Sequence, residues 1–204
     1  AVAILRRTRI VANTLTSQSS PQVSITIGET NVKPPTTKTP IFYDLFSSPV
    51  GEMIVVADEH GVRHVDFQDC DRPLTMDSDW QRNPSFCRAA REQIQAYFTK
   101  ELTRFDLPLA PQGTEFQKLV WQELAKIPYG RFSTYGQMAK NMGRPTASRA
   151  IGMANGRNPL SIILPCHRVI GANKKLTGYR GGLPIKTYLL KLEGFDIDNQ
   201  LLMA

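Results

Sequence analysis

The proline-containing stretch Leu107-Pro108-Leu109-Ala110-Pro111 divides this chain of 204 residues into two segments with different hydrophobic patterns. Before it, short apolar runs separated by turn residues indicate β-strands, and after it apolar residues recur at helical spacing. Proline fixes φ and has no backbone N–H, so such a stretch interrupts regular structure. We therefore predict two domains, at residues 41–110 and 114–194.

The two ends of the chain are expected to lie outside these domains. Residues 1–40 are rich in Thr, Ser and Pro and show no hydrophobic period, which predicts a disordered tail or linker. Their first nine residues include three arginines and no acid, a composition compatible with a basic arm on DNA or with an organellar transit peptide. Residues 195–204 are expected to form a C-terminal tail.

The first domain is predicted to be of the α/β type, a small antiparallel β-sheet with a helix. Apolar runs at 41–46, 53–57 and 62–67, separated by turn residues, predict a β-meander. Residues 69–83 are polar and expected to be irregular. A helix is expected over 84–100, because the apolar residues there recur at helical spacing: Phe86, Ala90, Ile94, Tyr97 and Phe98.

The second domain is predicted to be mostly α-helical. Thr114, then Ser133 or Thr134, and then Thr146 are the expected N-caps of three successive helices. The second and third of these helices are joined by a short glycine-containing turn, which is typical of a helix-turn-helix. A last helix is expected from Ile185 to about Glu193.

Charge is distributed unevenly between the two domains. The chain has a net charge of +7, but residues 114–194 carry 13 Lys and Arg against 3 Asp and Glu, whereas residues 41–113 carry 7 against 12. A concentration of positive charge in one domain is typical of nucleic-acid binding. The three cysteines are irregularly spaced, which argues against a disulfide framework. No apolar run approaches the roughly 20 residues of a membrane span.

The stretch from Ser161 to Ile170 contains the strongest candidate for chemistry. An apolar run, 161–164, is interpreted as a short buried strand or extended segment, and Pro165 ends it. Cys166, His167 and Arg168 follow, and a thiolate near cationic groups is an effective nucleophile. Alone, Cys166 would be interpreted as a small buried hydrophobic residue. The polar residues that follow it favour a reactive thiol instead.

Other residues are candidates with structural alternatives. Glu193 could orient an imidazole or be a solvated surface charge. Arg149 stands among small residues that could approach DNA closely or serve helix packing, and there an arginine could fill a vacated base position. Asn158 is expected to brace a turn. Tyr135 could be a core residue or a phenolic donor. The glycine-rich segment around Tyr179 could be an ordinary loop, or its backbone could approach a ligand closely.

In sequence order, these motifs resemble a known family. Pro165-Cys166-His167-Arg168-Val169, followed by Gly178-Tyr179-Arg180-Gly181-Gly182, is similar to the signature of the O6-alkylguanine-DNA alkyltransferases, or methylated-DNA–protein-cysteine methyltransferases. The similarity covers about residues 114–194. Segment 41–106 fits the variable, ribonuclease H-like N-terminal domain of the family in type and length.

The resemblance implies a role for each matching residue. Cys166 would accept the alkyl group, His167 would take its proton through a water, Glu193 would steady the imidazole, Tyr135 would donate to N3 of the flipped guanine, and Asn158 would brace the turn before the active-site strand. Arg149 would be the arginine finger, with the minor-groove face formed by Ala147, Ser148, Ala150 and Gly152. The base pocket would be lined by the backbone at Cys166, Val169, Leu176 and Arg180, with Tyr179 on its wall.

The implied function is a single-turnover repair protein that transfers alkyl groups from O6-alkylguanine and O4-alkylthymine in double-stranded DNA to Cys166. It would act as a monomer without cofactor, in the bacterial cytoplasm and nucleoid or in a eukaryotic nucleus. Some members of the family have a structural zinc in the N-terminal domain, but none is expected here, because His60, His64, Cys70 and Cys87 lack a recognisable ligand spacing. The alternatives are a non-catalytic lesion-binding or regulatory DNA protein and a papain-like thiol hydrolase.

Overall fold

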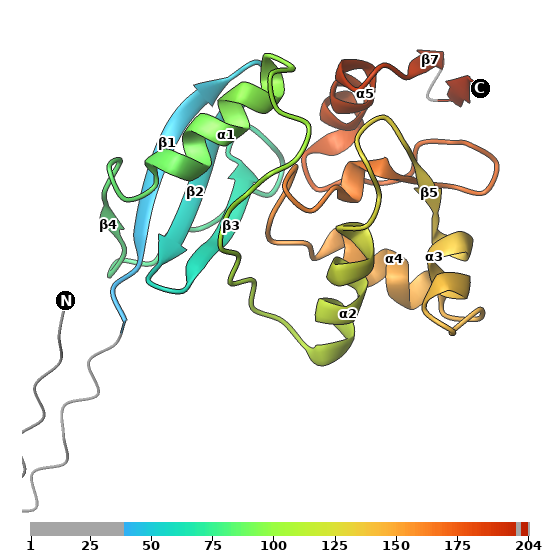
Figure 1. The fold of residues 1–204 in the computed structure, drawn as a ribbon, viewed down its shortest axis with the longest axis horizontal. Helices are drawn as coiled ribbons and strands as arrows, with labels where there is room; N and C mark the ends of the chain where they lie inside the picture. The colour runs from blue at the N-terminus through green and yellow to red at the C-terminus, as the bar shows by residue number, and fades with distance from the viewer. Residues whose placement is uncertain (1–38, 199–200, 204) are drawn as a thin grey trace, which may run out of the picture. The chain divides into compact units, whose positions relative to one another are not determined.

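The computed structural model of the protein describes residues 39–198 and 201–203 (Figure 1). The predictions for residues 1–38 lie outside these ranges. Within them, no helix is both long enough and apolar enough to cross a membrane.

A four-stranded sheet with strand order β3-β2-β1-β4 forms the first part of the described chain (Figure 1). As predicted, β1 (Phe42–Ser48), β2 (Gly51–Asp58) and β3 (Gly61–Phe67) form an antiparallel meander. The prediction of a wholly antiparallel sheet was wrong, because β4 (Gln81–Arg82) pairs with β1 in parallel. This short strand lies in the segment expected to be irregular, and two residues are too few to show a period.

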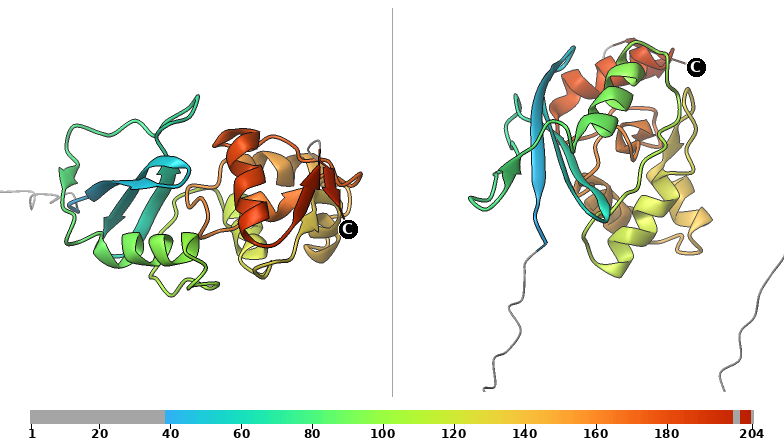
Figure 2. Two further views of the ribbon diagram at one scale, coloured as in Figure 1. Left: turned by 90° about the horizontal axis from the view of Figure 1, so that it is seen from above. Right: turned by 60° about the vertical axis from the view of Figure 1, so that its left-hand side comes forward.

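Helix α1 (Arg88–Phe98) packs against the sheet (Figures 1 and 2). Its buried side chains are the predicted ones, Ala90, Ile94, Tyr97 and Phe98. The helix begins later than predicted. Phe86 stands before it, is 44% exposed, and lies with its ring centroid 4.6 Å from that of Phe42. Its backbone N–H donates to Asn83 Oδ1, so the preceding residues form a turn instead of helix.

The second part of the chain is mostly helical, as predicted, with α2 (Glu115–Leu124), α3 (Tyr135–Asn141), α4 (Ser148–Gly156) and α5 (Gly182–Leu192). Thr114 caps α2 in a capping box with Gln117, and Thr134 caps α3. The predicted Thr146 cap was wrong. Ala147 occupies the N-cap of α4, and its backbone N–H bonds to the Arg144 carbonyl, so the preceding turn needs no side-chain acceptor.

Two short sheets complete the helical part. β5 (Ser133–Thr134) pairs in parallel with β6 (Val169–Ile170), which follows the reactive stretch. β7 (Asp196–Asp198) pairs with β8 (Leu201–Met203) within residues 195–204, which were expected to be a tail.

The outer edge of β3 joins the sheet to the helical part. Val65 N–H donates to the Pro159 carbonyl at 2.9 Å, and Ser161 N–H donates to the Val65 carbonyl at 2.9 Å. Val62 makes the equivalent pair of bonds with Pro108 and Ala110 of the connecting stretch. An uncovered strand edge would expose unpaired backbone groups. Here the edge is occupied by the segment that leads directly into Cys166.

Candidate active site

The stretch before Cys166 folds as a tight turn, so the prediction of a short strand or extended segment at 161–164 was wrong. Leu160 forms one isolated bridge with Val65, and the chain then turns at Ser161–Ile163, with φ of 73° at Ile162. A positive φ is strained for a β-branched residue, so the surrounding contacts must hold it. Pro165 then leads into the 3₁₀ helix η1 (Cys166–Arg168). An apolar run does not distinguish a buried turn from a buried strand.

Asn158 supplies the contacts that hold this turn. Its Nδ2 donates to the Leu164 carbonyl at 2.8 Å and to Cys166 Sγ at 3.1 Å, and its Oδ1 accepts from Leu160 N–H at 3.0 Å. The side chain is only 2% exposed. One amide therefore bridges both ends of the turn and also contacts the sulfur.

Cys166 is buried, with 3% of its surface exposed. Burial raises the pKa of its thiol, and the Asn158 hydrogen bond and the Lys186 charge only partly oppose this effect. The resting sulfur is therefore a thiol, which must lose its proton before it can act as a nucleophile.

His167 and Glu193 meet in the folded protein, a contact that sequence alone left open. His167 Nε2 lies 2.9 Å from Glu193 Oε1, and both side chains are fully buried. Burial opposes ionisation of Glu193, but hydrogen bonds from His167 and Arg168, with the Arg168 charge, outweigh it and lower the pKa of this carboxyl to about 2. Burial lowers the pKa of His167, which favours the neutral ring.

An ionised carboxylate can only accept hydrogen bonds, so we assign the proton of the neutral ring to Nε2. Nδ1 then carries a lone pair, and this atom has no hydrogen-bond partner among the described residues. A neutral imidazole oriented by a buried carboxylate is the arrangement of a general base.

Arg168 was expected only as a cationic group near the thiol, but in the structure it anchors the Glu193 carboxylate. Its Nε and Nη2 donate to Glu193 at 2.8 Å, and its Nη1 donates to the Ile127 carbonyl at 2.7 Å. Gly130 N–H adds a bond to Glu193 Oε2 at 3.2 Å. The sequence does show a basic residue directly after the Cys–His pair, but it does not show where the side chain of that residue points.

Lys186 is a second residue that the sequence analysis missed. It is fully buried, and its Nζ donates to the carbonyls of Val169 at 2.7 Å and Thr177 at 3.1 Å. Burial lowers the pKa of this ammonium to about 8. It connects the strand after Cys166 to the segment that leads to the glycine-rich stretch. Lys186 lies three and four residues before Leu189 and Leu190, so helical spacing places it on the buried face of α5. This spacing could have predicted its burial from the sequence.

The glycine-rich stretch lies against β3. The Tyr179 ring centroid is 5.9 Å from that of Phe67, and Arg180 Nε is 2.5 Å from Asp66 Oδ2. A Cβ built at Gly181 would be 2.7 Å from the Phe67 ring, so the backbone approach there requires glycine. Of the other expected pocket residues, Val169 and Leu176 are buried.

Tyr135, the first residue of α3, connects α3 and α4 to this stretch. Its hydroxyl accepts a hydrogen bond from Thr177 Oγ1 at 3.2 Å, and a Cβ at Gly152 of α4 would lie 3.7 Å from its ring. The α4 residues expected to face DNA are grouped at the start of that helix, where Arg149 and Ala150 are exposed and Ala147 and Ser148 are half-buried.

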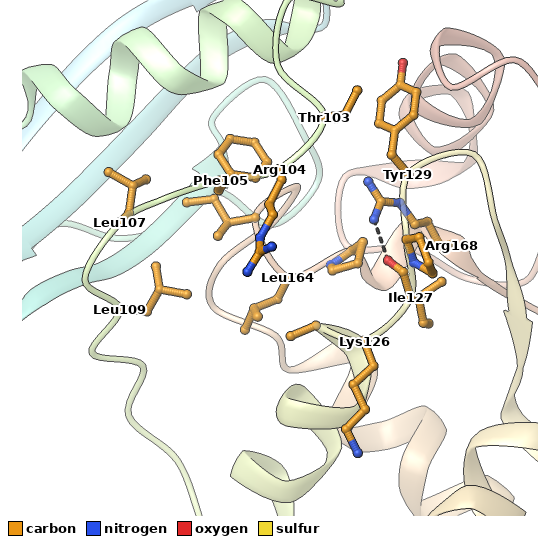
Figure 3. Close-up of a pocket in the computed structure, with 14 residues that line it drawn as sticks. Thr103, Arg104, Phe105, Leu107, Leu109, Lys126, Ile127, Tyr129, Leu164 and Arg168 are labelled. Carbon is orange, nitrogen blue, oxygen red and sulfur yellow. Dashed lines mark hydrogen bonds between the residues drawn. The ribbon is translucent and has the colours of Figure 1, made fainter.

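A cavity of about 640 Å³ lies between the connecting stretch and the residues around Leu164 and Arg168 (Figure 3). Its lining includes Leu107 of the connecting stretch, Leu164 and Arg168, but neither Cys166 nor His167. It is therefore distinct from the sulfur site.

No metal-binding cluster of three His, Cys, Asp or Glu side chains occurs in residues 39–198 and 201–203. The three cysteines are free thiols. The expectation that this chain needs no metal remains a prediction.

Both parts of the chain match models of one protein family. Residues 115–195 match the family described as "6-O-methylguanine DNA methyltransferase, DNA binding domain", and residues 41–111 match its ribonuclease-like domain. The chain belongs to the 6-O-methylguanine DNA methyltransferase family.

Members of this family from distant organisms are similar along most of their length. A methylated-DNA–protein-cysteine methyltransferase of Methanosarcina acetivorans is 54% identical over 76% of this chain and 99% of the relative. One from Haemophilus influenzae is 40% identical over 76% of this chain and 87% of the relative. A crystal structure of Mycobacterium tuberculosis OGT in complex with DNA matches with a TM-score of 0.69 and 43% identity, over 74% of this chain and 92% of that one. The fold of a small sheet domain followed by a helical domain is therefore that of the family.

Proposed function

We propose that this protein removes the alkyl group from O6-alkylguanine, and from O4-alkylthymine, in double-stranded DNA by transferring it to Cys166. The observation that carries the proposal is the fully buried contact of 2.9 Å between Glu193 Oε1 and Nε2 of His167, the residue that directly follows a cysteine braced by Asn158. The pair supplies what the resting thiol lacks, a base.

The proton of the Cys166 thiol passes to His167 Nδ1 through a water molecule. The sulfur then attacks the alkyl carbon, the S–C bond forms as the C–O6 bond breaks, and the electron pair moves to the guanine. Glu193 stabilises the imidazolium that results. Tyr135 donates a hydrogen bond to N3 of the leaving base. The thioether on Cys166 is not reversed, so each molecule acts once.

DNA is bound by α3, the turn and α4 as a helix-turn-helix that enters the minor groove. Small side chains at Ala147, Ser148, Ala150 and Gly152 allow close approach without sequence readout, and Arg149 fills the place of the flipped base. The flipped base occupies a pocket formed by Val169, Leu176, Tyr179 and Arg180. The basic charge of residues 114–194 supplies affinity for phosphates.

The remaining parts of the proposal concern the whole molecule. The sheet and α1 form a ribonuclease H-like domain that supports the reactive one, and the protein acts as a monomer without a cofactor. It is localised with the DNA, in the bacterial cytoplasm and nucleoid or in the eukaryotic nucleus.

The first prediction concerns Cys166→Ala. Wild-type protein incubated with duplex DNA containing O6-methylguanine should gain the mass of one methyl group on the Cys166 peptide, with one gain per molecule. Cys166→Ala should show no gain while still binding the duplex, because only the acceptor atom is lost. Intact-protein and peptide mass spectrometry measures both.

Cys70→Ala is the matched control, since this half-buried free thiol lies outside the site and should leave transfer intact. A wild-type protein that binds the lesion without any mass gain would support the non-catalytic lesion-binding alternative. Transfer that persists in Cys166→Ala would contradict the assignment of the acceptor.

A further inference from the structure

Tyr97 of α1, a residue of the N-terminal domain, contacts both His167 and Glu193. Tyr97 is fully buried, and its hydroxyl donates to Glu193 Oε1 at 2.8 Å and lies 3.5 Å from His167 Nε2. We propose that Tyr97 is a positioning residue for alkyl transfer, which holds the Glu193 carboxylate so that His167 keeps its proton on Nε2 and presents Nδ1 as the base. This inference rests on the proposed function and extends it to the other domain.

The hydrogen bonds of the carboxylate show what Tyr97 adds. Oε2 accepts from Arg168 Nε at 2.8 Å and from Gly130 N–H at 3.2 Å. Oε1 accepts from His167, from Arg168 Nη2 at 2.8 Å and from Tyr97. Tyr97 is thus a direct donor to the oxygen that orients the imidazole, and it comes from outside residues 115–195, the range matched by the family's DNA-binding domain.

Packing fixes the direction of the hydroxyl. The Tyr97 ring has its centroid 5.6 Å from that of Phe98, 5.8 Å from that of Phe105 and 6.1 Å from that of Tyr129. Aromatic contacts at these separations restrict the ring. Burial, followed by the charge and hydrogen bond of Glu193, raises the pKa of Tyr97 far above its ordinary value, so the hydroxyl remains a donor.

The hydrogen bond from Tyr97 to Glu193 influences the protonation of His167. The charged groups that influence its protonation are Glu193, Arg168 and Lys186, and Tyr97 acts through the first of them. When a donor is removed from a carboxylate, its negative charge is less compensated and attracts an imidazolium more strongly. Loss of the Tyr97 hydroxyl therefore raises the pKa of His167.

Tyr97→Phe keeps the ring and removes only the hydroxyl. Tyr129→Phe is the matched control, because the Tyr129 hydroxyl donates to the Leu192 carbonyl and not to Glu193. The ring nitrogens of His167 are followed by ¹⁵N NMR from pH 4 to 8, with His60 and His64 as internal references. Single-turnover transfer from methylated duplex is measured over the same range, with duplex affinity and thermal unfolding measured separately.

In Tyr97→Phe we expect the His167 titration and the acid limb of the transfer profile to move up by about one pH unit. The plateau rate of transfer should fall about tenfold, and duplex affinity should not change. Tyr129→Phe should show neither shift. An unchanged His167 titration in Tyr97→Phe, or the same shift in both variants, would overturn the inference.

The proposed function and the positioning role of Tyr97 can be rejected independently of each other. Absence of methyl transfer in the wild-type protein would reject the proposed function. The NMR titration needs no substrate, so it still decides whether Tyr97 controls the imidazole.

Discussion

At the scale of single residues, Asn158 illustrates how one side chain can serve both fold and chemistry. Its amide satisfies a backbone N–H and a backbone carbonyl on opposite sides of the turn that carries Ile162 at positive φ. The same nitrogen contacts the Cys166 sulfur and favours its ionised form. Removal should therefore affect stability and reactivity together.

We expect Asn158→Ala to lower the free energy of unfolding by about 2–4 kcal/mol, because two buried backbone groups lose their partner. The Cys166 thiol should also titrate at higher pH, since a hydrogen bond that lowers its pKa is lost. Urea denaturation measures the first effect, and the pH dependence of iodoacetamide labelling measures the second.

Asn173→Ala is the control. Asn173 also accepts a hydrogen bond from a turn N–H, that of Lys175, but it is exposed, so its loss should cost well under 1 kcal/mol. Equal losses in the two variants would contradict the role given to Asn158.

At the scale of elements, α4 and α5 serve the site in different ways. Lys186, Leu189, Leu190 and Glu193 follow one another at helical spacing, so α5 and its C-cap present two charged groups on a buried face. Helix α4 instead leaves its first turn open, with Arg149 exposed among small residues. We propose that α4 binds DNA, and that α5 and its C-cap support β6 and His167.

This division predicts a selective effect of Arg149→Ala. Transfer from methylated duplex should fall by at least about tenfold, because the flipped base is no longer replaced in the stack. Transfer from a free O6-alkylguanine base should be unchanged, since Cys166 and His167 are untouched. Single-turnover kinetics with the two substrates measure the ratio.

Arg157→Ala is the control, because Arg157 is an exposed arginine at the other end of the same helix. It should produce only the small, salt-dependent loss of affinity expected for one positive charge. A parallel fall with both substrates in Arg149→Ala would contradict the assignment.

At the scale of the whole molecule, the sheet domain contacts several parts of the candidate active site. The edge of β3 pairs with the turn before Cys166, Tyr97 reaches Glu193, and Asp66 pairs with Arg180 of the glycine-rich stretch. Each contact joins the N-terminal domain to a different part of the site. The sheet domain therefore contributes to positioning the site.

The Asp66–Arg180 ion pair should make the glycine-rich stretch sensitive to pH. Burial raises the pKa of Asp66 to about 6, although the Arg180 charge lowers it in part. The folded state thus binds this proton more tightly than the unfolded state, so this group's contribution to global stability is present below about pH 4 and is lost as pH rises to about 6. Local order should change in the opposite direction, because protonation removes the charge that holds Arg180.

We therefore expect amide hydrogen-exchange protection of residues 178–182 to fall between pH 7.5 and pH 5 in the wild-type protein. Asp66→Asn should show the lower protection at both pH values. Asp58→Asn removes a buried carboxylate that pairs with Arg63 inside the sheet, and it should leave residues 178–182 unaffected. Protection that is independent of pH and of Asp66 would contradict this role.

Much of the fold could be predicted from local pattern. The meander followed from three short apolar runs with turn residues between them, and the Thr114 and Thr134 caps from residue types that accept backbone N–H bonds. The errors lie where pattern carries no information. β4 is too short to show a period, and the apolar run before Cys166 is a turn because Asn158 and the edge of β3 provide its hydrogen bonds.

The sequence alone determined the family and indicated Cys166 and His167 as the candidate reactive pair, because both inferences depend on residue types in a fixed order around Pro165, Cys166 and His167. Only the tertiary structure decided which charges meet. Glu193 and Tyr97 are separated from His167 by 26 and 70 positions, yet they lie within hydrogen-bond reach of its ring or of one another. Hydrogen bonds and ion pairs act over a few ångströms in space, and sequence separation says nothing of that distance until the chain has folded.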